Sequence, residues 1–216
     1  MELLTFDDYI VVCIKPAGVL STDEPGGVPE LVREALGDPA ATVRTVHRLD
    51  QVVGGVMLLA RSRSAASRLG QQVMGRGFEK QYLAVVHGVP GAPAGTLRDL
   101  LWRSKPERKT YVVSEPGEGV QEAVLDYTLL GSREGLSLLR ITLHTGRTHQ
   151  IRCQFSSRGL PRVGDRKYGD PAEDCGIALW SYRLGFDHPH TGERVTVCAL
   201  PPQIRYPWNL FEIERE

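Results

Sequence analysis

Apolar runs of strand length, rich in β-branched residues and bounded by Gly, Pro or acidic residues, recur along this 216-residue chain. Such runs favour β-strands, and their succession mostly as hairpins predicts antiparallel pairing. We therefore expect an α+β fold with a mixed, mostly antiparallel central sheet and flanking helices and loops. The strand candidates are residues 3–6, 9–14, 43–46, 56–60, 78–87, 109–113, 122–130, 136–143, 177–186 and 194–200.

Helical signals are fewer. Residues 30–36 show helical spacing and end at Gly37, and residues 62–74 end at Gly75. A short third helix is expected to begin near Thr148 and to end before Gly159. The sequence has no internal repeat, low-complexity tract or linker, so we expect a single domain over residues 1–216.

Hydrophobic content of 41% and charged content of 24% are typical of a globular protein. No apolar run is long enough to span a bilayer, and the early acidic residues do not resemble a signal peptide, so a cytoplasmic location is expected. Neither the histidines nor the cysteines show convincing ligand spacing, so no metal is expected. The scattered cysteines are expected to be reduced core thiols: Cys13, Cys153, Cys175 and Cys198.

A net charge of +0 would argue against a nucleic-acid partner, but the charge is unevenly distributed. Between residues 140 and 169 the only acid is Asp165, among several arginines and a lysine. Within this stretch His144, Arg147, His149, Gln150 and Arg152 fall in nine residues. A helix beginning there would place His149 and Arg152 on one face and offer an anion site with Arg147; a solvated basic turn is the alternative.

Two further residues could carry chemistry. Asp50 lies between a strand and a Gly-rich turn, where a carboxylate can face a cleft and act as nucleophile, general base or ligand. Viewed alone, it fits a turn-capping partner of a nearby arginine better. Tyr82, on the same strand face as Lys80, could stack on a base or transfer a proton, or be a core aromatic.

The order and spacing of these blocks resemble the RluA-type family of RNA pseudouridine synthases over nearly the whole chain. The matching blocks are residues 7–12, Lys15-Pro16-Ala17-Gly18, His47-Arg48-Leu49-Asp50, Gly55 to Ala60, residues 80–84, residues 145–152, Gly159, Pro161, residues 163–165, Tyr168-Gly169, and a late strand with Leu179, Leu184, Phe186 and His188-Pro189.

The resemblance implies roles for particular residues. Asp50 matches the catalytic aspartate, Tyr82 the tyrosine that stacks on the target base, and Arg152 the arginine that pairs with the catalytic carboxylate. Arg48 matches an arginine near the flipped-out nucleotide. Other positions match or adjoin the RNA and base-binding residues: His47, Arg147, His149, Gln150, Ile151 and Leu179.

The implied reaction isomerises uridine in tRNA or rRNA to pseudouridine without a cofactor or metal, and the implied state is a monomer. Asp50 would attack C1′ of the ribose or abstract a ribose proton, and both routes remain open. A non-catalytic RNA-binding protein on the same scaffold is the alternative; a glycosidase would need a second acid beside the first. No S4-type RNA-binding domain is expected, because the matching blocks begin near the start of the chain.

The chain departs from the family pattern in two places. Val52-Val53-Gly54-Gly55 replaces a Thr-Ser-Gly-like turn and lacks both hydroxyls, and Gln154 stands where a histidine is common. Neither departure changes Asp50, Tyr82 or Arg152. RNA recognition is expected from the basic 140–169 face and from loops 21–29 and 103–109, the second of which carries cations suited to phosphate contacts.

Overall fold

A computed structural model describes residues 1–75 and 77–214 of the chain. The chain folds into two compact units. Unit 1 comprises Met1–Lys80 and Trp180–Pro201, and unit 2 comprises Gln81–Leu179 and Pro202–Glu214. The divisions fall inside two strands, after Lys80 and after Leu179.

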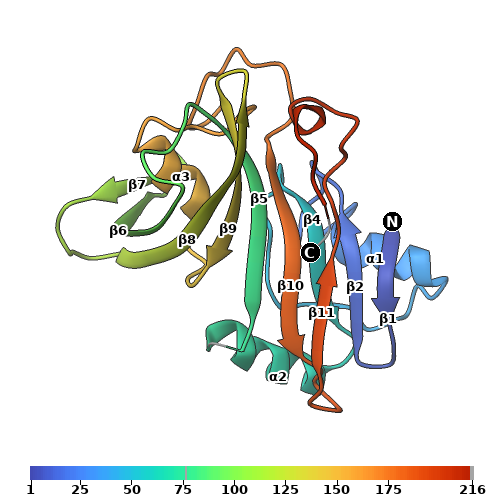
Figure 1. Cartoon of the computed structure of the whole chain (residues 1–216). Helices are drawn as coiled ribbons and strands as arrows, with labels where there is room; N and C mark the ends of the chain where they lie inside the picture. The colour runs from blue at the N-terminus through green and yellow to red at the C-terminus, as the bar shows by residue number, and fades with distance from the viewer. Residues whose placement is uncertain (76, 215–216) are drawn as a thin grey trace. The chain divides into compact units, whose positions relative to one another are not determined.

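Unit 1 is built on strands in the order β1-β2-β4-β10 (Figure 1). β11 extends this order by pairing with β10, and β3 pairs with the end of β4. β4 and β10 pair in parallel and the other pairs are antiparallel, including the hairpin expected at the start of the chain. The bounds are β1 Glu2–Phe6, β2 Ile10–Lys15, β3 Arg44–Thr45, β4 Gly54–Ala60, β10 Leu179–Asp187 and β11 Arg194–Cys198.

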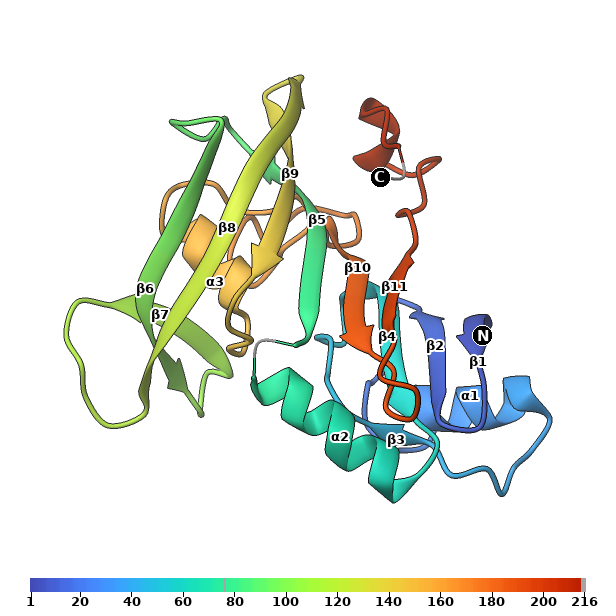
Figure 2. The ribbon, with the colours of Figure 1, turned by 60° about the horizontal axis from the view of Figure 1, so that its bottom comes forward.

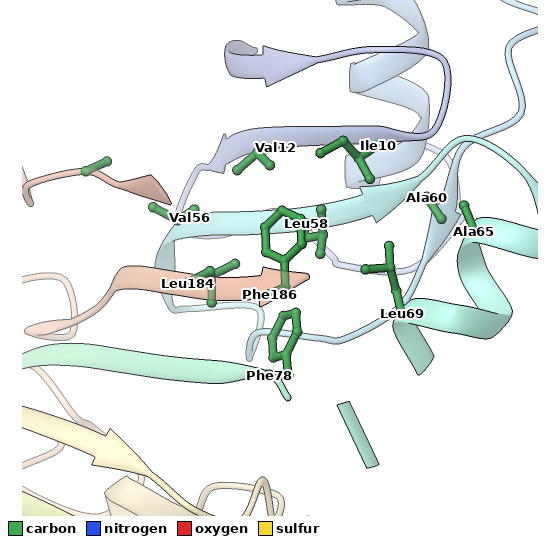
Figure 3. Packing of buried hydrophobic residues seen from close by; sticks show 11 residues of the cluster. Ile10, Val12, Val56, Leu58, Ala60, Ala65, Leu69, Phe78, Leu184 and Phe186 are labelled. Carbon is green, nitrogen blue, oxygen red and sulfur yellow. The ribbon is translucent and has the colours of Figure 1, made fainter. Parts of the chain in front are cut away.

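The helices α1 (Val28–Leu36) and α2 (Arg63–Met74) belong to unit 1. α1 ends at Gly37 in the left-handed conformation, as expected. The Ser62 hydroxyl caps α2 by accepting from the backbone N–H of Ala65 at 3.1 Å. α2 contacts β3 and β4 (Figure 2). Its buried residues join a core from alternate positions of β2, β4 and β10 (Figure 3): Ile10, Val12, Val56, Leu58, Ala60, Ala65, Leu69, Phe78, Leu184 and Phe186.

Unit 2 is built on strands in the order β5-β9-β8-β6-β7, with antiparallel pairing throughout. Helix α3 (Gln150–Ser156) contacts β6 and β7, and Cys153 from this helix packs with Leu101 and Ala123. A 3-10 turn spans Trp208–Leu210. The strand bounds are β5 Glu79–His87, β6 Ala94–Ser104, β7 Lys109–Val113, β8 Val120–Arg133 and β9 Leu136–Leu143.

The mixed, mostly antiparallel pairing confirms the predicted α+β class. Three expectations were wrong. Residues 94–104, not predicted as a strand, form β6, and α3 begins at Gln150 rather than near Thr148. All four cysteines are free thiols, but only Cys13 and Cys153 are buried. Among the helices of the described ranges, none is both long and apolar enough to cross a membrane.

Candidate active site

The loop that carries Asp50 is held to its surroundings by the hydroxyl of Ser21. This hydroxyl accepts from the backbone N–H of Leu49 at 3.1 Å and donates to the carbonyl oxygen of the same residue at 2.8 Å. Thr45, at the end of β3, donates its hydroxyl hydrogen to the Ser21 carbonyl at 2.9 Å. The residue before Asp50 therefore has both backbone polar groups satisfied by one buried side chain, which restricts the backbone entering Asp50.

The turn after Asp50 is held by hydrogen bonds from the side chain of Lys15. The backbone N–H of Val53 donates to the Asp50 carbonyl at 2.9 Å. The Lys15 side chain is fully buried, and its ammonium donates to the carbonyls of Gln51 at 2.9 Å and Val53 at 2.7 Å. A third bond joins the ammonium to the Pro16 carbonyl at 3.0 Å. The turn that lacks the family's two hydroxyls is thus held through its carbonyls by a cation.

Burial lowers the pKa of Lys15 to about 8, against the opposing attraction of Asp50. Desolvation disfavours the charged ammonium, whereas the carboxylate of Asp50 and the three carbonyls favour it. The positive charge of Lys15 therefore belongs to the electrostatic surroundings of Asp50. Sequence reasoning matched residues 15–18 to the family but assigned Lys15 no role.

The structure gives His47 a structural contact, and its predicted place near the RNA stays a prediction. The ring is buried and its Nε2 accepts from the backbone N–H of Leu58 in β4 at 3.0 Å. Burial, with the nearby charge of Lys80, lowers the pKa of His47 to about 3, so the ring is neutral. A buried neutral acceptor bonded to a strand holds the loop in place. Arg48 next to it is exposed, as an RNA contact requires.

In unit 2, Tyr82 is buried on β5, where its register partner on β9 is Ile141. Ile151 on α3 and Leu179 at the start of β10 are also buried and apolar. These three residues have the character expected of a base-binding region, and their assignment to one stays a prediction.

Arg152 on α3 forms a bidentate ion pair with Asp165. Its Nε lies 2.9 Å from Oδ2 and its Nη2 lies 2.7 Å from Oδ1 of that carboxylate. Nη2 of Arg162 also donates to Oδ2, at 2.7 Å. All three side chains are buried. The resemblance predicted Asp50 as the partner of Arg152, and the structure adds Asp165, which sequence reasoning did not identify.

His149 and Arg152 both contact Tyr168, but His149 precedes α3 in the left-handed conformation, so the two do not form the shared helix face that the spacing predicted. Nδ1 of His149 lies 2.9 Å from the Tyr168 hydroxyl, and Cζ of Arg152 lies 5.2 Å from the ring centroid. The same hydroxyl accepts from the backbone N–H of Thr110 in β7, at 2.7 Å. Tyr168 therefore joins α3 to strand β7.

Gln150 has a structural role, and its RNA contact stays a prediction. Its side chain is buried; Oε1 accepts from the Arg147 backbone N–H at 3.0 Å and from the Thr145 hydroxyl at 2.8 Å. Its Nε2 donates to the Val124 carbonyl at 3.1 Å. The turn before α3 is thus held from within. Arg147 remains the cationic side chain at its surface, with Nε bonded to the Glu122 carbonyl at 2.9 Å.

The sequence model of the RNA pseudouridylate synthase family matches residues 8–157. An uncharacterized RNA pseudouridine synthase of Aquifex aeolicus is 33% identical, and the alignment covers 99% of this chain and 69% of the relative. The chain belongs to the RNA pseudouridylate synthase family. It is an isomerase that acts on RNA, of the RluA type that the residue blocks indicated.

Further comparisons agree with this. A tRNA pseudouridine synthase C of Pasteurella multocida is 30% identical to this synthase, over 92% of the chain and 90% of the relative. The solved structure of human RNA pseudouridylate synthase domain containing 4 has a TM-score of 0.78 at 24% identity, covering 93% of this chain and 89% of that one. This second likeness shows that the fold is shared.

The predicted site residues of the synthase are distributed between the two units. Unit 1 carries His47, Arg48 and Asp50. Unit 2 carries Tyr82, Arg147, His149, Gln150, Ile151, Arg152 and Leu179. Within the described residues, no three His, Cys, Asp or Glu side chains gather as a metal site would require. The residues that sequence reasoning missed are Lys15, Ser21, Asp165 and Tyr168; all but Ser21 lie in the matched blocks.

Proposed function

We propose that this synthase isomerises a specific uridine of structured tRNA or rRNA to pseudouridine, with Asp50 as its catalytic carboxylate. The observation that supports this most is the restraint of the Asp50 turn. Ser21 fixes the residue before Asp50, and the buried ammonium of Lys15 fixes the turn after it. A carboxylate that must meet one carbon or one proton of a substrate benefits from such preorganisation.

The reaction breaks the N1–C1′ bond, rotates the base and forms a C5–C1′ bond. C5 loses a proton and N1 gains one, so atoms and electrons balance without a co-reactant. Asp50 would act in its ionised form, either by attacking C1′ or by abstracting a ribose proton. Both routes demand the same negative charge, and the cationic Lys15 beside the turn complements it electrostatically.

The family resemblance supports the remaining assignments. Tyr82 would stack on the target base and take part in proton transfer, and Arg152 would pair with the catalytic carboxylate. Arg48 would occupy the position that the flipped nucleotide vacates, which offsets part of the cost of unstacking, a few kcal/mol. Arg147, His149, Ile151 and Leu179 would contact the RNA or its base.

Two observations support tRNA or rRNA as the substrate: the names of relatives and the exposed cations of this chain. The names of two relatives specify tRNA, for Pasteurella multocida, and the ribosomal large subunit, for Haemophilus ducreyi. The loop expected at residues 103–109 is the hairpin that joins β6 to β7, and it carries exposed cations suited to phosphates: Arg103 near the end of β6, and Lys105 and Arg108 in the turn. We propose RNA as the macromolecular partner of a cytoplasmic monomer.

A tritium-release assay tests the proposal. RNA transcribed with C5-tritiated uridine is offered as separate tRNA and rRNA pools, because pseudouridine formation releases the C5 label into water. We expect release from one pool, in proportion to the pseudouridine found by nucleoside analysis. Binding of both pools without release from either would contradict the proposal and favour a non-catalytic RNA-binding protein.

A further inference from the structure

Asp165 is buried, and all five of the hydrogen bonds described for its carboxylate come from protein donors. Arg152 occupies both of its oxygens, and Arg162 occupies Oδ2. The backbone N–H groups of Lys167 and Tyr168 both donate to Oδ1 at 3.3 Å. Asp165 therefore binds two guanidinium groups and closes its own turn at the same time.

The burial of these charges makes the arrangement energetically demanding. The exposed fractions of the side chains are 8% for Arg152, 0% for Arg162 and 0% for Asp165. Burial alone would raise the pKa of Asp165, but the hydrogen bonds and charges of the two arginines hold this pKa far below its ordinary value. The three groups together carry one more positive than negative charge. Removing one partner of a buried pair of this kind leaves an uncompensated buried charge and is strongly destabilising.

The geometry restricts the guanidinium of Arg152 on two sides. Asp165 holds the edge formed by Nε and Nη2, and the Tyr168 ring lies against the guanidinium, 5.2 Å from Cζ. A guanidinium is planar, so fixing one edge and one face fixes the direction of every N–H group. The loop itself is fixed, because a Cβ on Gly164 would lie 2.3 Å from the Gly176 carbonyl oxygen.

We propose that Asp165 is a positioning residue, which sets the orientation of Arg152 and so the direction in which its charge acts on the reaction. The bidentate pair sets this orientation, and Arg162 adds a single hydrogen bond to Oδ2. This inference rests on the proposed function, in which Arg152 pairs with the catalytic carboxylate. Asp165 acts only through Arg152.

The test separates positioning from folding by balancing charge. Asp165→Asn leaves two buried arginines without their common counter-ion, so we expect a large drop in melting temperature. The double variant Arg162→Met/Asp165→Asn keeps the native excess of one positive charge, so we expect folding to recover. Arg162→Met alone keeps the bidentate pair and serves as the matched control. Each variant is assayed for tritium release and for melting temperature.

If Asp165 positions Arg152, the folded double variant loses kcat on the order of 100-fold, whereas Arg162→Met stays close to wild type. KM for RNA changes little in both, because the lost interaction acts in the transition state. A double variant that regains kcat together with melting temperature overturns the inference. If the double variant does not fold, Asp165→Glu replaces it, because it keeps the charge and shifts the carboxylate by one methylene. A lowered kcat at unchanged KM then supports positioning. A kcat equal to that of wild type contradicts it.

One readout does not depend on activity. The Nε–H of Arg152, identified by its loss in Arg152→Lys, should exchange slowly with solvent in the wild type and in Arg162→Met. It should exchange rapidly in the double variant. If the Nε–H of Arg152 is protected equally in the wild type and in the double variant, the inference is overturned, whatever the tritium assay shows. A wild type that releases no tritium contradicts the proposed function and leaves the exchange test of Asp165 intact.

Discussion

Nε2 of His47 lies 3.0 Å from the backbone nitrogen of Leu58 and accepts its hydrogen. The proton of the neutral ring is therefore on Nδ1. The ring also packs on Phe78, with centroids 5.1 Å apart. Through this contact the loop that leads to Asp50 is attached to β4, the fully buried strand of unit 1. Protonation of Nε2 would oppose the Leu58 N–H directly and break the attachment.

This contact predicts acid sensitivity. The folded pKa of His47, about 3, lies below its ordinary value of 6.5. The unfolded chain then binds more protons between these values, so stability is complete above about pH 6.5 and falls as pH decreases. We expect this residue alone to cost about 1.4 kcal/mol per pH unit in that window. Chemical denaturation at several pH values measures it.

His47→Gln is the comparison for this measurement. Its amide oxygen can accept from Leu58, but it has no proton to gain. The difference in unfolding free energy between wild type and variant should shrink as pH falls. A difference that stays constant from pH 7 to pH 4 would show that His47 does not titrate as described.

Gly55, which follows the Asp50 turn, should tolerate no side chain. Its φ is +123°, and a Cβ there would lie 2.3 Å from the Ser181 carbonyl oxygen. We expect Gly55→Ala to lower the unfolding free energy by more than about 4 kcal/mol. Gly70→Ala is the matched control: it lies in α2, where an added Cβ would meet no atom within 4 Å, and should stabilise by about 0.5–1 kcal/mol. If urea denaturation shows the same change in unfolding free energy for Gly55→Ala and Gly70→Ala, the backbone of Gly55 does not lie as close to Ser181 as described.

Arg147→Ala should weaken RNA binding in a salt-dependent way. If the side chain contacts a phosphate, its removal reduces the slope of log K against log salt by about 1. Arg63→Ala, at an exposed position of α2, is the control and should leave the slope unchanged. Binding titrations at several salt concentrations measure both. An unaltered slope for Arg147→Ala would remove this residue from the RNA-binding surface.

Most elements could be predicted because their apolar residues recur with the spacing of a helix or of a strand. A glycine often marks the end of the element, as Gly37 does for α1. β6 could not. Leu97 and Leu101 face the core, but Asp99 between them interrupts the apolar pattern. Its carboxylate accepts from Nε2 of Gln154 at 2.7 Å and pairs with Arg158 at 2.9 Å. The two partners of Asp99 are more than 50 residues away in the sequence. The local sequence pattern around residues 94–104 therefore could not predict that Asp99 is accommodated in a strand.

The candidate site divides in the same way. Asp50 and Tyr82 could be singled out because the family blocks are local in sequence. The buried roles of His47 and Gln150 could not, because a polar side chain has the same identity whether it faces RNA or a backbone N–H. The partnership of Arg152 with Asp165 also depends on a tertiary turn, closed by Tyr168, that joins a loop to α3.

If Asp50 carries the chemistry, the isosteric variant Asp50→Asn removes the reacting charge without changing the size of the side chain. Asp8→Asn, an exposed acid of the same unit, is the control. Tritium release and RNA affinity are measured on the same C5-labelled RNA pools. We predict that Asp50→Asn abolishes release while its affinity for RNA stays within a few-fold of wild type, and that Asp8→Asn matches wild type in both. Release by Asp50→Asn at a rate near that of wild type would show that Asp50 is not the catalytic carboxylate.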